Sequence, residues 1–329
     1  MSTAVIAFTR RGAALGRTLA DALGGTLYAP ARFAAEVGAE PAQDLNAWTG
    51  ARWRDCRALV FVGAAGIAVR AIAPHVKDKF SDPAVVSVDE AGRFAVPLLS
   101  GHVGGANALA ERVAALTGGQ AAVSTATDVN GLFAVDVWAK EHGLAVTDRA
   151  LARAVSAALL EGEAVGFRSD DGALCPAGLT EGPAALGVWV TCRSGAGPFP
   201  RTLRLAPKRL ILGVGCRRGT AAEAIEAAAA EALAGYEPLA VAAVATIDLK
   251  QDEPGLRAFC AARSLPLLAF SAGELAAAEG DFTPSDFVKR VTGVDNVCER
   301  AAAAAGGRIV VPKLAKNGVT AAVAEKRKV

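Results

Sequence analysis

Histidines and aromatic side chains are scarce in this 329-residue sequence. There are three histidines, and Phe, Trp and Tyr together make up 5% of the chain. So few histidines leave little material for a His-based catalytic triad or a zinc site. The net charge is +2, and no basic stripe is interleaved with aromatic residues. We therefore expect no nucleic-acid partner and no bound metal.

Disulfide and membrane signals are also missing. The six cysteines form no C-x-x-C pair, which indicates reduced thiols and neither a disulfide framework nor a zinc site. Nothing at the N-terminus resembles a signal peptide. Apart from Ala-rich helices that carry spaced Glu, no run of about 18 apolar residues is free of Gly, Pro and charge. We therefore expect a cytoplasmic protein without a membrane partner.

The abundant residues favour an α/β fold. Hydrophobic residues make up 52% of the chain and are mostly Ala, Val and Leu, which suits helices packed on parallel sheets. Strand and helix periods alternate in the first third and again near the end. We predict a parallel-sheet N-terminal domain at 1–130, a small α/β middle segment with its linker at 131–206, and a second α/β domain at 207–329. The Gly- and Pro-rich stretch 193–200 is the predicted linker.

The most informative segment is Leu-Ile-Leu-Gly-Val-Gly-Cys-Arg-Arg-Gly-Thr at 210–220. It reads as a strand ending in Gly213 and Gly215, with its last two residues opening a helix. Helix N-termini attract anions, and Arg217 and Arg218 would add two permanent cations that suit carboxylate or phosphate. We therefore predict an anion-binding turn. For this turn alone, a plain strand-to-helix connection with solvated arginines is an open alternative.

A dinucleotide site is a poorer interpretation of the same segment. The glycine spacing is one residue longer than the Rossmann fingerprint, and no acidic residue ends a second strand about 20 residues later. Cys216 lies beside the two arginines, which would lower the pKa of its thiol if the side chain were exposed. A nucleophilic cysteine is then conceivable, although a water molecule would suffice.

Two glycine-rich turns upstream are similar. Gly63-Ala-Ala-Gly66 follows a predicted strand at 58–62, and Ser100-Gly-His-Val-Gly-Gly105 leads into a helix that starts near Asn107. His75 and His142 read as helix-end residues. For His102, within the second loop, a functional role and an ordinary loop position stay equally open.

Polar residues also gather after strands in the C-terminal part. In the run 292–300, capping explains Asp295 or Asn296 but not Glu299 and Arg300 together. Similar polar density occurs at 245–253 and at 313–317. In a parallel sheet such turns would share the edge at the carboxyl ends of the strands, where ligands of open α/β sheets bind.

Several of these stretches resemble one family, the cobalt-precorrin-5A hydrolases (CbiG proteins) of anaerobic-type cobalamin biosynthesis. The similar stretches are Gly63–Arg70, Asp82–Val86, Val88–Glu90, Leu99–Asn107, Gly213–Gly219, Thr246–Lys250, Thr292–Ala301 and Lys316–Thr320. The resemblance covers almost the whole chain and is weakest between about 145 and 207.

The resemblance implies an anionic substrate, a cobalt-containing tetrapyrrole with many acetate and propionate side chains. The family opens a δ-lactone on ring A and releases acetaldehyde, giving cobalt-precorrin-5B. A base-activated water would attack the lactone carbonyl, and the freed alcohol would then fragment in a retro-aldol sense. No cofactor is implied, because cobalt arrives within the substrate. Transient contact with neighbouring pathway enzymes is a further expectation.

Roles follow as hypotheses. His102 or Glu90 is the candidate base, and Asp295 and Glu299 are alternative acid/base groups. Arg217, Arg218 and Arg300 would clamp carboxylates, and Asp248 and Lys250 could form a structural ion pair. The candidate substrate-binding residues are Gly63, Gly66, Arg70, Gly101, Gly104, Gly105, Asn107, Gly213, Gly215, Cys216, Arg217, Arg218, Asp248, Lys250, Asn296, Arg300, Lys316 and Asn317. The competing hypothesis is a tetrapyrrole carrier of the same pathway with no chemistry of its own.

Overall fold

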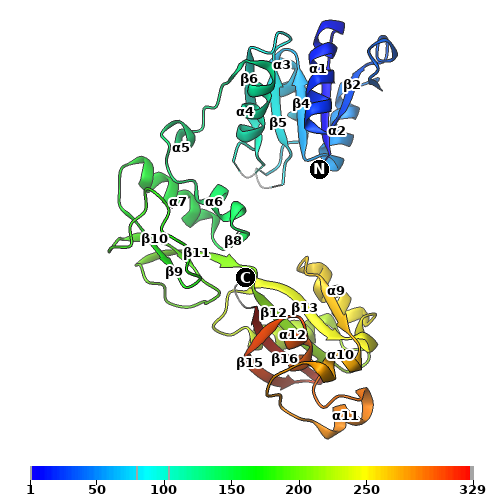
Figure 1. The fold of residues 1–329 in the computed structure, drawn as a ribbon, viewed down its shortest axis with the longest axis vertical. Helices are drawn as coiled ribbons and strands as arrows, with labels where there is room; N and C mark the ends of the chain where they lie inside the picture. Colours follow the sequence, from blue (N-terminus) through cyan, green and yellow to red (C-terminus); the bar gives the residue numbers. More distant parts are fainter. Residues whose placement is uncertain (1, 79–80, 103, 327–329) are drawn as a thin grey trace. The chain divides into compact units, whose positions relative to one another are not determined.

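A computed structural model describes residues 2–78, 81–102 and 104–326, so Val103 of the Leu99–Asn107 stretch lies outside the described residues. The chain forms three mixed α/β sheets (Figure 1). It divides into two compact units, residues 1–137 and 138–329. None of the helices in the described part of the chain is both long and apolar enough to span a bilayer.

The first unit is a seven-stranded sheet of order β3-β2-β1-β4-β5-β6-β7. Its strands are β1 (Thr3–Ala7), β2 (Thr26–Pro30), β3 (Glu40–Ala42), β4 (Ala58–Val62), β5 (Ala84–Val88), β6 (Phe94–Leu99) and β7 (Gln120–Ala121). Its helices are α1 (Arg10–Leu23), η1 (Ala35–Val37), α2 (Leu45–Asp55), α3 (Ala65–Ile72), α4 (Ala106–Thr117) and the short α5 (Ala126–Val129).

Alternating side chains give this sheet a core on each face. Val5, Val60 and Val86 pack with the buried residues of α1 and α4, which lie side by side on one face in Figure 1. Ile6 and Phe61 point the opposite way and pack with α2 and α3. A two-residue period with both faces covered is the expected pattern for a central strand of an α/β sheet.

One strand of this sheet departs from the expected parallel arrangement. β6 runs antiparallel to β5, with Val88 paired to Ala95 and Val85 paired to Leu99. The segment between the two strands is too short for a crossover helix and therefore forms a hairpin. As a result, the loop that follows β6 lies at the edge of the sheet opposite to the carboxyl ends of β1, β4 and β5.

The second unit contains two sheets. The four-stranded sheet, of order β8-β11-β10-β9, comprises β8 (Leu144–Val146), β9 (Val165–Ser169), β10 (Leu186–Val190) and β11 (Arg201–Pro207), with α7 (Arg149–Leu160) against it. The preceding helix α6 (Val135–Glu141) begins in the first unit and ends in the second. The stretch predicted to be an interdomain linker, 193–200, instead connects β10 to β11, which pair in parallel within this one sheet. That prediction was wrong, because Gly and Pro mark an irregular connection without showing whether its ends diverge.

The five-stranded sheet has the order β14-β13-β12-β16-β15. Its strands are β12 (Leu210–Cys216), β13 (Val241–Ile247), β14 (Leu267–Phe270), β15 (Gly307–Lys316) and β16 (Val319–Lys326). Its helices are α8 (Ala222–Ala232), η2 (Pro238–Ala240), η3 (Asp248–Lys250), α9 (Pro254–Ala262), α10 (Ala272–Ala277), α11 (Asp286–Thr292) and α12 (Cys298–Ala304). Residues of α8 and α9 pack on one face of the sheet and residues of α10 and α12 on the other.

Candidate functional site

Three turns of the C-terminal sheet meet at one edge, as the sequence predicted. β12 and β13 are parallel, so the turn after Cys216 and η3 lie at the same end of the sheet. β16 runs antiparallel to β12 and pairs Val319 with Cys216, which brings the β15–β16 hairpin to this end too. The backbone N–H of Arg217 donates to the carbonyl of Gly318 in that hairpin at 3.3 Å.

The arginine turn presents two unpaired cations. The Arg217 and Arg218 residues are exposed, and neither guanidinium forms an ion pair with any residue that the structure describes. The helix begins at Ala222, two residues later than predicted, and no side chain caps it. The turn therefore offers positive charge to an anion. Gly219 and Thr220, which were predicted to open the helix, precede it.

The glycines before the arginines serve packing. A Cβ atom on Gly213 would overlap the carbonyl oxygen of Cys298 in the first turn of α12. A Cβ on Gly215 would lie 2.6 Å from the hydroxyl of Thr320 on β16. Both glycines lie within β12. The strand therefore continues through both of them, and among the three glycines of this segment only Gly219, with a φ of 77°, provides a left-handed turn.

Glu253, which sequence reasoning did not single out, connects two of the turns. Its side chain is 7% exposed and accepts hydrogen bonds from the Gly219 N–H at 2.6 Å and from Lys250 Nζ at 3.0 Å. The expected Asp248–Lys250 ion pair is absent among the described residues, because Lys250 pairs with Glu253 while Asp248 accepts from the Leu249 N–H. Polar density marked this run of sequence, but nothing local distinguished Glu253 from its acidic neighbours.

The half-buried Cys216 lacks the environment of a nucleophile. Burial raises the pKa of its thiol above the usual value, and the nearby ammonium of Lys250 does not reverse that shift. The thiol is therefore protonated near neutral pH, contrary to the lowered pKa considered for an exposed side chain.

The β15–β16 hairpin explains two further candidates structurally. Asn317 and Gly318 have φ values of 49° and 80°, the pair of positive values that a two-residue hairpin turn requires. Lys316 Nζ lies 2.7 Å from a carboxylate oxygen of Glu231 on α8. An Asn-Gly turn and an occupied ammonium therefore account for these residues without a ligand.

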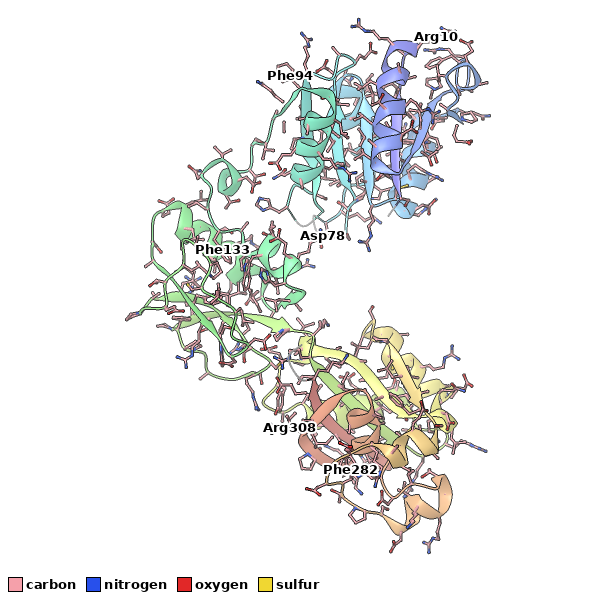
Figure 2. All side chains as sticks on the ribbon, viewed as in Figure 1. Arg10, Asp78, Phe94, Phe133, Phe282 and Arg308 are labelled. Atoms are coloured by element: carbon pink, nitrogen blue, oxygen red, sulfur yellow. The ribbon has the colours of Figure 1, made fainter. Side chains whose placement is uncertain are left out.

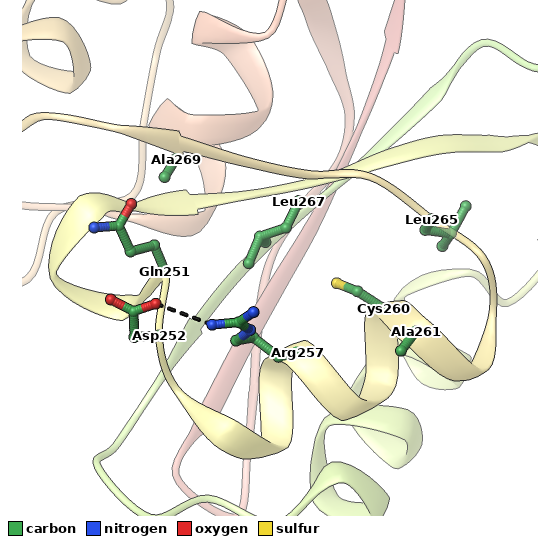
Figure 3. A pocket seen from close by; sticks show the side chains of 8 residues that line it. All are labelled: Gln251, Asp252, Arg257, Cys260, Ala261, Leu265, Leu267 and Ala269. Atoms are coloured by element: carbon green, nitrogen blue, oxygen red, sulfur yellow. Dashed lines mark hydrogen bonds and ion pairs between the residues drawn. The ribbon is translucent and has the colours of Figure 1, made fainter.

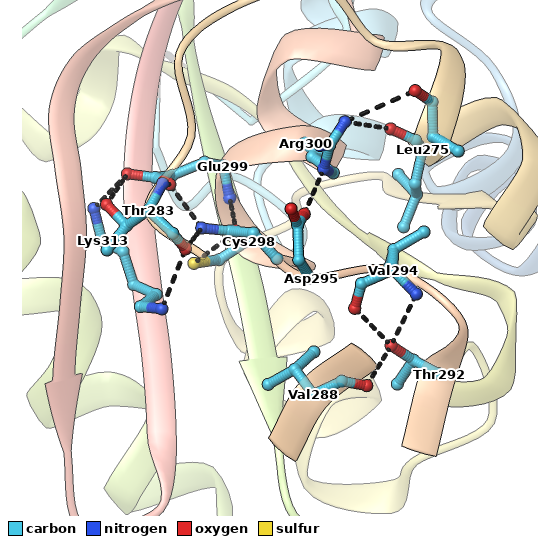
Figure 4. Close-up of polar contacts among 12 residues, drawn as sticks. Leu275, Thr283, Val288, Thr292, Val294, Asp295, Cys298, Glu299, Arg300 and Lys313 are labelled. Atoms are coloured by element: carbon cyan, nitrogen blue, oxygen red, sulfur yellow. Dashed lines mark hydrogen bonds and ion pairs between the residues drawn. The ribbon is translucent and has the colours of Figure 1, made fainter. Parts of the chain in front are cut away.

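The run 292–300 forms a buried polar cluster (Figure 4). Glu299 is 1% exposed, and its carboxylate accepts from Thr283 N–H and Lys313 N–H, each at 2.7 Å, from the Thr283 hydroxyl and from the Asn296 side-chain amide. Asn296 in turn accepts from the Glu299 N–H at 2.9 Å. All the lone pairs of Glu299 are engaged, which suits a structural anchor better than an acid/base group.

Arg300 is also engaged within the protein. Its Nε donates to Asp295 at 2.8 Å, one of its terminal nitrogens donates to the carbonyl of Leu275, and its guanidinium lies 4.6 Å from the ring centroid of Phe282, a residue labelled in Figure 2. The hydrogen bond and charge of Arg300 hold the pKa of Asp295 below its usual value. The expected free clamp at Arg300 is therefore a tether between α12 and α10.

The first unit places its candidates at two opposite edges. Glu90 follows β5 at the carboxyl ends of the parallel strands and accepts from the Thr9 hydroxyl at 2.6 Å. Gly63 follows β4 at the same edge, and its N–H donates to the carbonyl of Val88. Gly66 and Arg70, in the adjoining α3, are exposed. This edge combines a half-exposed carboxylate with a glycine turn.

His102 lies at the other edge, because β6 is antiparallel. Its Nε2 is 3.0 Å from Asp128 and its Nδ1 is 3.6 Å from Asp136, and hydrogen bonding to Asp136, opposed by burial and aided by both charges, raises the pKa of the imidazole. Asn107 also donates to Asp128. His102 and Glu90 therefore do not share a site, and neither aspartate was anticipated from sequence.

Three loop glycines complete that edge. Gly104 and Gly101 are tightly packed, since Cβ atoms on them would press against Ser100 and the Asn107 side chain, whereas Gly105 is left-handed with a φ of 91° and open space around it. Their expected contact with a ligand thus has a packing explanation at two of the three positions.

A pocket of about 500 Å³ lies in the C-terminal sheet region between α9 and β14 (Figure 3). Arg257 and Asp252 form an ion pair at 3.2 Å beside it. The lining residues are Gln251, Asp252, Arg257, Cys260, Ala261, Leu265, Leu267 and Ala269. None of the predicted site residues lines it.

These features define an α/β protein whose sheet edges carry glycine-rich and cationic turns suited to an anionic ligand. Comparison with known families agrees with that class. Residues 47–128 match the profile "Cobalamin synthesis G N-terminal", residues 133–207 match "Cobalamin biosynthesis central region" and residues 210–324 match "Cobalamin synthesis G C-terminus".

Full-length relatives point the same way. The chain is 36% identical over 282 residues to "Cobalt-precorrin-5A hydrolase" of Salmonella typhimurium, covering 80% of each chain. It is 30% identical to the protein of the same name from Priestia megaterium, covering 91% of this chain and 87% of that one. "Protein CobE" of Sinorhizobium sp is 36% identical over 35% of this chain and 79% of its own length. The chain belongs to the cobalamin synthesis G (CbiG) family.

Proposed function

We propose that this protein hydrolyses cobalt-precorrin-5A, opening the ring A δ-lactone and releasing acetaldehyde to give cobalt-precorrin-5B. The observation that carries the proposal is the 36% identity over 80% of both chains to a relative of that name. The exposed Arg217 and Arg218 support it, because a substrate bearing acetate and propionate groups needs exposed cations. No protein-bound cofactor is part of the proposal, since cobalt enters within the substrate.

Among the candidate bases, Glu90 fits the proton transfer best. It is partly exposed, and it lies at the carboxyl edge of the parallel strands, where ligands of α/β sheets bind. His102 is a poorer candidate, because two carboxylates raise its pKa and favour the protonated ring, which cannot accept a further proton. All the lone pairs of Glu299 are already engaged in hydrogen bonds. Asp295 is held by Arg300. We assign the base to Glu90.

The reaction balances as the addition of one water and the loss of one acetaldehyde. Glu90 takes a proton from water while the water oxygen bonds to the lactone carbonyl carbon. The ring C–O bond then breaks, and the departing alkoxide receives the proton from Glu90. Deprotonation of the new secondary alcohol then cleaves the adjacent C–C bond. Acetaldehyde leaves, and the bonding electrons pass to the macrocycle, which takes up a proton.

Incubation with cobalt-precorrin-5A tests this function. We expect trapped acetaldehyde and the ring-opened acid in equal amounts, the latter detected by mass spectrometry. Glu90→Gln should lower kcat by at least 100-fold, within the range for loss of a general base, while Glu111→Gln on the exposed side of α4 should not. If substrate is bound but neither product forms, the protein is a carrier.

The carrier hypothesis has one observation in its favour. A separate protein, "Protein CobE", is similar to 35% of this chain over 79% of its own length, so part of this chain has a counterpart that exists by itself. We propose the domain limits 1–130, 131–206 and 207–329. We also propose a cytoplasmic location and transient contact with neighbouring pathway enzymes. A fragment beginning at 207 that binds the tetrapyrrole without turnover would assign binding to the C-terminal domain and chemistry to the remainder.

A further inference from the structure

Glu253 occupies a helix N-cap position but does not cap its helix. It precedes Pro254 at the start of α9, and its side chain makes no capping hydrogen bond there. Instead the carboxylate reaches two other turns, accepting from the Gly219 N–H at 2.6 Å and from Lys250 Nζ at 3.0 Å. A carboxylate that is 7% exposed needs such partners, because burial of an unpaired charge is costly.

The bond to Gly219 acts on the arginine turn directly. Gly219 has a left-handed φ of 77°, so the backbone reverses immediately after Arg218. The Thr220 hydroxyl donates to the Arg217 carbonyl at 2.8 Å, which closes the same turn. A Cβ on Gly255 would overlap the Thr220 carbonyl oxygen, so the first turn of α9 also packs against this segment.

Charge reinforces the arrangement. Lys250 lowers the pKa of Glu253 by hydrogen bonding, and the Gly219 N–H and the charge of Arg218 act in the same direction, so the carboxylate is ionised at neutral pH. Lys250 is thereby held beside the turn that carries Arg217 and Arg218. One buried anion thus gathers cationic groups from two separate turns while leaving the two guanidinium groups without a partner among the described residues.

We infer that Glu253 is a positioning residue that, through the Gly219 amide and Lys250, holds the 217–220 turn as a carboxylate-binding surface for the acetate and propionate side chains of the substrate. This inference rests on the proposed function, because it names the part of the substrate that the surface binds. Glu253 does not touch the substrate. It acts through the Gly219 amide and the Lys250 ammonium, so its loss should weaken binding without altering bond cleavage.

The test compares Glu253→Ala and Glu253→Gln with Asp252→Asn, a matched control at the neighbouring acid, which pairs only with Arg257 among the described residues. Glutamine keeps an oxygen for the Gly219 N–H but loses the charge that holds Lys250. We expect Glu253→Ala to raise KM roughly tenfold with kcat within about twofold, Glu253→Gln to recover part of that loss, and the control to match the parent. Thermal unfolding of each variant checks that the chain is folded.

A binding assay separates this inference from the hydrolase activity. Metal-free uroporphyrin, a polycarboxylate tetrapyrrole without the lactone, serves as the probe, and fluorescence quenching gives its Kd. We expect Kd to rise for Glu253→Ala and for the Arg217→Ala/Arg218→Ala pair. A shifted Kd without any acetaldehyde release would support the inference while refuting the hydrolase proposal.

Three results would overturn the inference. The first is an unchanged Kd for folded Glu253→Ala while the Arg217→Ala/Arg218→Ala variant binds uroporphyrin more weakly. The second is an unchanged Kd for both, which would remove the binding surface itself. The third is a lower kcat with an unchanged KM in Glu253→Ala, which would make Glu253 a residue that acts in bond cleavage.

Discussion

The Glu299 carboxylate on α12 accepts a hydrogen bond from the backbone N–H of Lys313 on β15 at 2.7 Å. The same carboxylate holds the loop at Thr283 through that residue's N–H at 2.7 Å. One buried side chain therefore joins a helix, a strand and an irregular loop, as Figure 4 shows.

Replacing this anchor should destabilise the C-terminal sheet region. Glu299→Ala leaves the backbone N–H groups of Thr283 and Lys313 without their acceptor and removes one of the two acceptors of the Asn296 amide. We expect a loss of about 2–4 kcal/mol in the free energy of unfolding. Chemical denaturation measures it. Asp286→Ala, on an exposed first turn of α11, is the control. Wild-type stability with lost turnover would instead make Glu299 a catalytic group.

Removal of the two exposed arginines, Arg217 and Arg218, should weaken binding and leave stability unchanged. Arg217→Ala with Arg218→Ala should weaken binding of a polycarboxylate tetrapyrrole by about 1.5–3 kcal/mol, the range for hydrogen bonds to charged groups. Because both residues are exposed, the unfolding midpoint should stay unchanged. Calorimetric titration at two salt concentrations checks the charge contribution, which should be smaller at high salt. An unaltered affinity would leave the arginines as solvated turn residues.

The environment of His102 predicts a pH dependence of the loop that carries it. Hydrogen bonding to Asp136, with the charges of Asp128 and Asp136, raises its pKa above the usual 6.5. A group with a raised folded-state pKa stabilises the fold fully below its unfolded pKa, and this contribution is lost as pH rises through the folded pKa. The contact of His102 with Asp128 in α5 should therefore be fully formed below the unfolded pKa of histidine and should weaken as pH rises through the raised pKa of the imidazole.

Nuclear magnetic resonance can follow this titration at the His102 ring, together with amide exchange in α5. Asp136→Asn should move the His102 midpoint down toward the usual value, because it removes the main stabilising partner of the imidazolium. A midpoint that does not respond to this substitution would contradict the arrangement.

The local sequence pattern predicted part of the fold and part of the candidate site. The apolar run before Gly213 and the polar run after Ile247 placed two turns at one sheet edge correctly, because parallel strands bring their carboxyl ends together. The direction of β6 was missed, since alternation along a strand is the same in either direction. The shortness of the connection after Val88 was the available signal. Asn317-Gly318 was likewise a readable hairpin turn.

Long-range partners could not be read from sequence. Asp128 and Asp136 lie beside His102 only in the folded chain, where α5 and α6 place them. Glu253 differs from its acidic neighbours only through its contacts with Gly219 and Lys250, which come from turns after two different strands. These contacts depend on the fold as a whole, whereas composition and period describe neighbours along the chain.

The packing role of Gly213 gives a final prediction. Its missing side chain lets the first turn of α12 lie directly on β12, where an added Cβ would overlap the Cys298 carbonyl oxygen. Because a backbone carbonyl cannot rotate away, Gly213→Ala must push the helix off the sheet, and we expect a loss of about 3 kcal/mol in the free energy of unfolding. Gly66→Ala is the matched control, since Gly66 is an exposed position of α3 with nothing within 4 Å of its Cβ position, and this variant should gain about 0.5–1 kcal/mol. Denaturant titrations of the two variants measure both changes. The folded fraction of Gly213→Ala should still bind uroporphyrin through Arg217 and Arg218, because the clash lies in the helix–sheet interface. Unchanged stability with lost binding would return Gly213 to the ligand-contact role that the sequence first suggested.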